Sequence, residues 1–304
     1  MLIGQILMFS PTSRPTSNPS RSRRRYALIA GSLTLTVATV SCSSASGDAE
    51  GMPSPAQPYP SHIHGLAVEP DTQKVLIASH EGLFTVEGSF VRPTGEDIDL
   101  MGFTVGGDGT YFASGHPGPG VDLPNPVGLI SSTDGRTWSQ VARGGESDFH
   151  TLTATYQGII GFDGTVRLSA DGSTWTDAAT QISPYNLAGN PATELVVATT
   201  EEGIYRSTDA GQTWTKESDA PIVLVAAVTA DAEIFGVLPS GEVITSTDAG
   251  LTWQQAGSVA GQPSAITTVQ GTGDQEIWVA TENGLEKSVD NGLTFTTAVD
   301  ASAS

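Results

Sequence analysis

Five histidines, two aspartates and one methionine in the first half of the chain have side chains that can bind a transition metal. These candidates are His62, His64, His80, His116, His150, Asp99, Asp148 and Met101. Imidazole with carboxylate favours zinc, whereas imidazole with a thioether favours copper, so both metals stay open. A structural role is the alternative for each residue, because polar side chains at the start of a strand often bond to turn backbone.

The positions of these residues on expected strands bring them to one place. Four segments align as the innermost strands of successive repeats, and each contributes to two columns that are two residues apart. One column holds His62, Asp99, Asp148 and Ser183, and the other holds His64, Met101, His150 and Tyr185. Residues two apart on a strand face the same side, so both columns can face one opening.

Two further histidines, His80 and His116, lie at the expected ends of second strands. In an antiparallel pair the end of the second strand lies beside the start of the first, so all five histidines should meet at one rim, over the first three repeats. We expect a metal site there, with His64 and His150 as its preferred ligands. A tetrahedral site takes four ligands, which is fewer than the number of candidates. Some of the candidates must therefore lie near the metal without binding it.

The strands that carry these residues follow from an internal repeat. Five segments share a pattern close to S-T-D-A-G-x-T-W, with Phe295 in place of the last Trp of the fifth copy. Their aspartates, spaced 37, 38, 39 and 42 residues apart, are Asp134, Asp171, Asp209, Asp248 and Asp290. Ser and Asp can bond turn backbone and Gly supplies a positive φ, so each copy predicts a hairpin turn. The first two copies are one residue shorter and should turn differently.

Around these motifs the chain shows four short apolar segments per repeat, with Gly-rich connections and no helical period. The glycines near the start of the third segment are Gly82, Gly128, Gly164, Gly203, Gly241 and Gly284. Four strands in about forty residues make one blade of a β-propeller. The register predicts an all-β, six-bladed β-propeller built from these repeats, whose first blade lacks the motif. The alternative, seven blades, needs about forty more residues than the chain supplies.

The repeated motif resembles the Asp box, or BNR repeat, of sialidase-like propellers. The segments that start the inner strands, together with Ser114–Pro117, are similar to bacterial exported propellers classed as glycosylhydrolases of the sialidase-like superfamily. The resemblance covers residues 62–300. It implies a propeller in which the Asp boxes are structural turns, and it makes glycoside hydrolysis an alternative to binding.

For a hydrolase the catalytic candidates are Asp99, Asp148 and Tyr185. A sialidase would also need three arginines for its substrate carboxylate. Of the five arginines after residue 42, Arg136, Arg167 and Arg206 lie in or just before Asp boxes, so no triad can be assembled. A neutral glycan is then the expected substrate. Whether the protein is an enzyme stays open, and a propeller that presents its rim to a protein partner is the third alternative.

The N-terminus predicts export. Three arginines, 23 to 25, precede an uncharged run from Tyr26 to Val40, which is shorter than the roughly 20 residues of a membrane span. Such a run is typical of a signal peptide. Cys42 is the only cysteine and is similar to the lipidated cysteine of bacterial lipoproteins. We expect a signal peptide over 1–41, a lipidated cysteine and flexible tether over 42–61, and the propeller over 62–304, held outside the cytoplasm as a membrane-anchored lipoprotein.

Charge narrows the choice of partners. The chain has 13 Lys and Arg against 33 Asp and Glu, a net charge of −20 with neutral histidines. Five of the basic residues and none of the acidic ones precede Cys42, which leaves about −25 for the rest. So acidic a surface repels nucleic acid and favours a metal cation or a basic protein, with a glycan less favoured. Alternatively, the excess of acidic residues only keeps an exported protein soluble.

Overall fold

The computed structural model describes residues 58–270 and 274–302, and this part of the chain forms six antiparallel sheets of four strands each. Blades 1 to 3 consist of β1 (Ile63–Val68), β2 (Val75–Ser79), β3 (Gly82–Glu87), β4 (Phe90–Thr94), β5 (Ile98–Val105), β6 (Tyr111–Pro117), β7 (Leu129–Ser132), β8 (Ser139–Ala142), β9 (Thr151–Thr155), β10 (Gly158–Phe162), β11 (Val166–Ser169) and β12 (Thr176–Asp177). Blades 4 to 6 consist of β13 (Asn186–Gly189), β14 (Val196–Thr200), β15 (Gly203–Ser207), β16 (Thr215–Lys216), β17 (Val225–Val228), β18 (Ile234–Val237), β19 (Glu242–Ser246), β20 (Gln254–Ser258), β21 (Pro263–Val269), β22 (Glu276–Thr281), β23 (Gly284–Ser288) and β24 (Thr296–Asp300).

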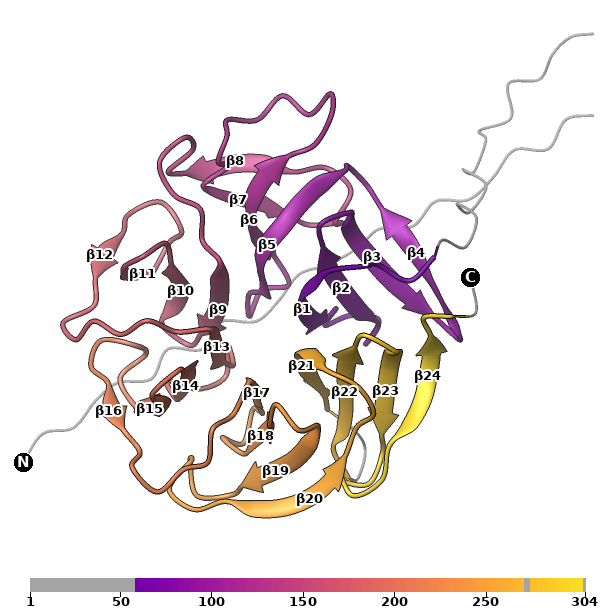
Figure 1. Cartoon of the computed structure of the whole chain (residues 1–304). Coiled ribbons are helices and arrows are strands. Elements are labelled where there is room, and N and C mark those ends of the chain that lie inside the picture. Colours follow the sequence, from indigo (N-terminus) through magenta and orange to yellow (C-terminus); the bar gives the residue numbers. More distant parts are fainter. Residues whose placement is uncertain (1–57, 271–273, 303–304) are drawn as a thin grey trace, which may run out of the picture. The chain divides into compact units, whose positions relative to one another are not determined.

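The six sheets surround a common centre, and the first strand of each blade is innermost (Figure 1). Several inner and second strands are short runs that are buried along their length, such as β17 and β14. The outermost strands β12 and β16 are polar and exposed. The expected all-β, six-bladed propeller is confirmed, and the described residues form no seventh blade. No helix that could cross a membrane occurs among them.

The ring closes by side-chain packing between blades 1 and 6, because each blade keeps four strands that are consecutive in sequence. One core cluster joins Ile77 and Phe84 of blade 1 to Trp278 and Leu285 of blade 6. Tyr59, from the segment expected to be a tether, packs against the same cluster. Burial of apolar area at this seam therefore has to supply the closure energy. The expected signal peptide and the cysteine at position 42 lie outside the described residues.

The five segments that resemble Asp boxes connect the third and fourth strands of blades 2 to 6, as the repeated pattern predicts. In blade 4 the Ser207 hydroxyl donates to Asp209 (2.7 Å) and accepts from the amide of Gly211 (2.8 Å). The amide and hydroxyl of Thr213 donate to the same carboxylate (2.9 and 2.6 Å). The equivalent threonine bonds hold the pKa of Asp248 at about 2. These carboxylates are therefore turn elements.

The two shorter Asp boxes turn differently, as their length predicts. In blade 2, Asp134 accepts from the successive amides of Arg136 and Thr137 (2.8 and 3.1 Å). Its turn has one residue with positive φ, Gly135 (69°), whereas the turn of blade 4 needs two, Ala210 (55°) and the glycine that follows it. The motif tryptophans pack inward; those at 138 and 214 are buried, and those at 175 and 253 are half-buried.

Candidate metal site at one rim of the propeller

The histidines gather at one face because of strand direction. The innermost strands start at this face and the second strands end there, while the Asp boxes connect third to fourth strands at the opposite face. His64 lies at the start of β1, His80 directly follows β2, and His116 lies near the end of β6. Asp148 and His150 precede β9. The expected convergence on the rim of blades 1 to 3 agrees with this topology.

Bulges in three innermost strands turn residues of one column toward the centre. The strand register shifts at His64 in β1, at Met101 in β5 and at Ser264 in β21. A bulge leaves one residue unpaired and redirects its side chain. All three residues line the central channel, whose volume is about 440 Å³. The bulges therefore bring an imidazole and a thioether to the same channel mouth.

Three donor residues form the first contact group, which we call group 1: His64, His80 and Asp99. One ligand atom from each lies within 4.8 Å of the others. His80 Nδ1 is 2.7 Å from Asp99 Oδ1, and the rings of His64 and His80 meet edge to face with centroids 4.6 Å apart. His64 Nε2 is buried without a hydrogen-bond partner, and the buried Asp99 Oδ1 meets His80 as an ion pair outside hydrogen-bond geometry. Buried polar atoms without partners are rare, which makes this group a candidate site.

The surroundings keep His64 in the form that binds a metal. Burial lowers the pKa of His64, and the neighbouring His80 lowers it further, while the Asp99 carboxylate acts in the opposite direction. A neutral imidazole has a free lone pair, which a metal ion requires. His64 should therefore be neutral and ready to coordinate at neutral pH.

Three more donors form a separate contact group, group 2: His116, Asp148 and His150. Asp148 Oδ2 is 3.4 Å from His116 Nε2 and 2.9 Å from His150 Nε2. The other carboxylate oxygen, Oδ1, is buried without a partner. His116 Nδ1 is 2.8 Å from Asn125 Oδ1, in the long connection between β6 and β7. Six of the eight sequence candidates thus form two groups where one site was expected.

The remaining candidates lie outside both groups. The ring of His62 packs edge to face on His80, with centroids 5.0 Å apart. Met101 lines the channel beside group 1. Tyr185 is 61% exposed and its amide donates to the carbonyl of Thr199, 2.8 Å away. The expected pairing of His64 with His150 does not occur among the contacts, because His150 contacts Asp148 and His64 lies with His80.

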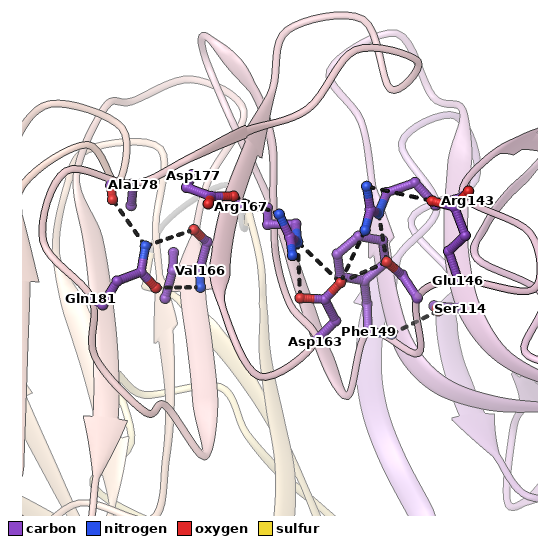
Figure 2. A network of polar contacts seen from close by, with 11 residues as sticks. Ser114, Arg143, Glu146, Phe149, Asp163, Val166, Arg167, Asp177, Ala178 and Gln181 are labelled. Atoms are coloured by element: carbon purple, nitrogen blue, oxygen red, sulfur yellow. Dashed lines mark hydrogen bonds and ion pairs between the residues drawn. The ribbon is translucent and has the colours of Figure 1, made fainter.

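A polar network holds the segment that carries Asp148 (Figure 2). Arg143 and Arg167 both point to Asp163, whose side chain is 6% exposed. The Ser147 hydroxyl donates to Asp163 (2.6 Å) and accepts from Arg143 Nε (2.5 Å). This network fixes the residue directly before Asp148.

The other side of Asp148 is anchored as well. The amide of Phe149 donates to the hydroxyl of Ser114, 2.9 Å away, and both residues are fully buried. The Phe149 ring stacks on Trp175 with centroids 4.7 Å apart. Since backbone on both sides is fixed, Asp148 cannot retract from the rim without breaking buried contacts.

The arginines are used in ion pairs. Arg92 contacts Glu87, Arg206 contacts Glu217, and Arg143 and Arg167 share Asp163. Arg167 was expected to lie far from the rim, but it reaches the turn between β10 and β11, which is on the rim face. Each of these four guanidinium groups therefore has a carboxylate partner within the fold.

The sequence predicts the histidine and aspartate donors at the rim, but it does not predict the features that orient their side chains. No sequence motif predicts the bulges at His64 and Met101, although both residues belong to one aligned column. Asn125 lies in the connection between β6 and β7, and the repeat pattern does not predict the path of that connection. The division into two groups depends on side-chain directions. A repeat register gives the blade and the column of a residue, but not its neighbour across blades.

Comparisons with known proteins identify the fold. No family model and no curated protein matches the chain. Among solved structures, a GH74 enzyme of Niastella koreensis is similar with a TM-score of 0.54 and 16% identity over 81% of this chain, and a GH74 xyloglucanase of Xanthomonas campestris with 0.50 and 13% over 80%. This chain spans 37% and 46% of those two chains.

A third similar structure is YCF48 bound to a D1 peptide. Its TM-score is 0.51 and its identity 16%, and the alignment covers 81% of this chain and 83% of that one. At such identities the likeness concerns the fold alone. These comparisons therefore show a β-propeller and leave the activity to the residues of the rim.

Proposed function

We propose that this protein is a metal-binding propeller that takes up a Zn²⁺ or Cu²⁺ ion at group 1. The observation that carries the proposal is the buried His64 Nε2, which has no hydrogen-bond partner, in a group whose ligand atoms all lie within 4.8 Å. The buried Asp99 Oδ1 of the same group contacts His80 Nδ1 at 2.7 Å, outside hydrogen-bond geometry. An unsatisfied buried polar atom costs about 1–3 kcal/mol. A bound cation removes that cost for His64 Nε2 and gives the Asp99 carboxylate a second positive partner.

The donor set suits a site that exchanges ligands. Two imidazoles and one carboxylate give three protein ligands, which leaves at least one coordination position of a zinc or copper ion for another molecule. Met101 at the same channel mouth offers a thioether, which would favour copper over zinc. The acidic surface supports the proposal, because it raises the local concentration of cations.

Metal binding by the full chain tests the proposal. The purified protein is dialysed against Zn²⁺ or Cu²⁺ and then against metal-free buffer, and its metal content is measured. The double variant His64→Ala, His80→Ala should lose one ion per chain and stay folded, because His80 is exposed and His64 only half-buried. Tyr185→Phe, in the same column but outside both groups, is the matched control and should bind as the parent does.

An unchanged metal content in the folded double variant would contradict the proposal. Loss of folding in the double variant, seen by circular dichroism, would show that the two histidines are structural. Asp99→Asn is the second variant for that case, because it keeps the shape of the side chain while it removes the negative charge that the ion needs.

Glycoside hydrolysis is the second candidate function. Asp99 and Asp148 both lie at the rim with one buried oxygen, which contacts His80 in Asp99 and has no hydrogen-bond partner in Asp148. Glycosidases use two carboxyl groups, one as acid and one as base or nucleophile. The similarity to GH74 enzymes supports a fold that can host this chemistry. Turnover of aryl glycosides and of xyloglucan by the metal-free full chain, abolished in Asp148→Asn, would favour hydrolysis over metal binding.

The location and the partner belong to the same proposal. An anchor at Cys42 would hold the rim outside the cytoplasm, where a single cysteine spent on lipid leaves no disulfide and packing alone must stabilise the fold. The solved structure with a D1 peptide is an example of a similar propeller that binds a peptide. A basic protein segment is the partner that the acidic surface would favour.

A further inference from the structure

We infer that group 2 is a second metal site, separate from group 1. It goes beyond the function proposed above, because its ligands are three other side chains, His116, Asp148 and His150. The rim would then hold two ions of the zinc or copper class. The inference rests on the tautomer of His116, on its distance from the Asp148 carboxylate and on the rigidity of the segment that carries Asp148.

Asn125 sets the tautomer of His116. His116 Nδ1 lies 2.8 Å from the amide oxygen of Asn125, which accepts a hydrogen bond and cannot donate one. The proton of the neutral ring is then on Nδ1, so Nε2 carries a lone pair. Metal-binding histidines commonly have their second nitrogen held in this way.

The nitrogen with that lone pair lies close to an acceptor. His116 Nε2 is 3.4 Å from Asp148 Oδ2, and two acceptors this close repel unless they share a proton or a metal ion. Zinc binds imidazole nitrogen and carboxylate oxygen at about 2.0–2.2 Å, so two such ligands at a tetrahedral angle are about 3.3–3.6 Å apart. The observed separation is the one that a shared zinc ion requires.

His150 supplies the third ligand. Its Nε2 is 2.9 Å from the same oxygen of Asp148, and its side chain is 59% exposed, so the ring can rotate toward an ion. Asp148 Oδ1, buried and unpartnered, leaves the carboxylate with unused bonding capacity. Among the described residues only group 1 has three donor atoms within 4.8 Å, so group 2 must adjust and should bind more weakly.

Asp148 is held in place while its neighbours adjust. The Ser147 hydroxyl is fixed by Arg143 and Asp163, and the amide of Phe149 is fixed by Ser114, as Figure 2 shows in part. A rigid carboxylate lowers the entropy cost of capturing an ion.

The two sites are neighbours on blade 2. Asp99 of group 1 and His116 of group 2 stand opposite each other in the register of β5 and β6. Side chains in such pairs have Cβ atoms about 4.5–5.5 Å apart. Two divalent ions this near repel each other, so the ion at group 2 should bind second and with the lower affinity.

Zinc titration of the metal-free full chain, followed by calorimetry, tests the inference. The parent should bind two Zn²⁺ per chain, one more tightly than the other. Asp148→Asn and His116→Ala should each remove the weaker ion only, and the His64→Ala, His80→Ala variant should remove the tighter one only. Asn125→Leu should weaken the second ion by about 10–100-fold and leave the first unchanged. Tyr185→Phe is the control.

The outcomes separate the two proposals. One ion that is lost with group 1 variants and unaffected by Asp148→Asn would overturn the second site and leave the proposed function standing. One ion that is lost only with group 2 variants would support the second site and overturn the first. One ion lost with either set would mean a single shared site and would overturn this inference. If Asp148→Asn does not fold, His150→Gln at the exposed position replaces it.

Discussion

Replacing Gly115 with alanine should damage both the fold and the metal site. Gly115 lies in β6 opposite Leu100 and has a φ of +144°, which only glycine adopts readily. An added Cβ would lie 1.9 Å from the carbonyl oxygen of Asp99 and 3.0 Å from the amide nitrogen of Met101. Strand β5, which carries Asp99 of group 1, would have to move away at its bulge.

The size of the effect follows from two terms. The positive φ costs about 1–2 kcal/mol for a residue with a Cβ. Forcing extra volume into a packed site costs about 1–3 kcal/mol more. The free energy of unfolding should therefore fall by about 2–5 kcal/mol, which lowers Tm by about 4–20 °C in a domain of this size. Displacement of Asp99 should also weaken zinc binding at group 1.

Gly109→Ala is the matched control. Gly109 also has a positive φ (83°), but its added Cβ would meet nothing within 4 Å, so only the conformational term of about 1–2 kcal/mol applies. Urea unfolding and zinc titration of both variants measure the difference. Equal losses of stability, or a Gly115→Ala protein that binds zinc as tightly as Gly109→Ala, would refute the close approach of β6 to the bulge.

Three further predictions concern the seam, the pH dependence and the anchor. Leu285→Ala, which empties a fully buried position between blades 6 and 1, should lower the free energy of unfolding by about 2–5 kcal/mol in urea. The pKa of His64 is lower in the folded protein than its ordinary value of 6.5 in the unfolded chain. At a pH near or below 6.5 the unfolded chain therefore binds more protons at His64 than the folded protein does. The metal-free protein should therefore lose stability as pH falls below about 6.5, and less so in His64→Ala, by thermal melts at several pH values. Cys42→Ser should abolish lipid labelling and release the protein from the membrane fraction, and persistent attachment would contradict the anchor.

The blades could be predicted because their signals are local. An Asp box needs only Ser, Asp and Gly at fixed spacing to satisfy a turn, and the bonds around Asp209 are those that the motif predicts. The glycine register depends on positive φ, which residues such as Gly82 and Gly284 adopt at 107° and 133°. The six glycines of this register, together with the five motif copies, predict six blades.

The metal groups could be predicted only in part, because they are not local. Strand direction predicts that His64 and His150 reach the same rim, and they do. Their partners depend on bulges and on a connection between β6 and β7 that belongs to no repeat. Asn125 in that connection turns His116 toward Asp148, and a repeat pattern carries no information about such a contact.

Anomalous scattering at the zinc edge, from crystals of the protein grown with Zn²⁺, tests the central claim most directly. A peak should lie within about 2.0–2.2 Å of His64 Nε2, of a ring nitrogen of His80 and of a carboxylate oxygen of Asp99. A zinc-loaded protein whose anomalous peaks lie elsewhere, with these three side chains in mutual contact and no ion between them, would contradict it.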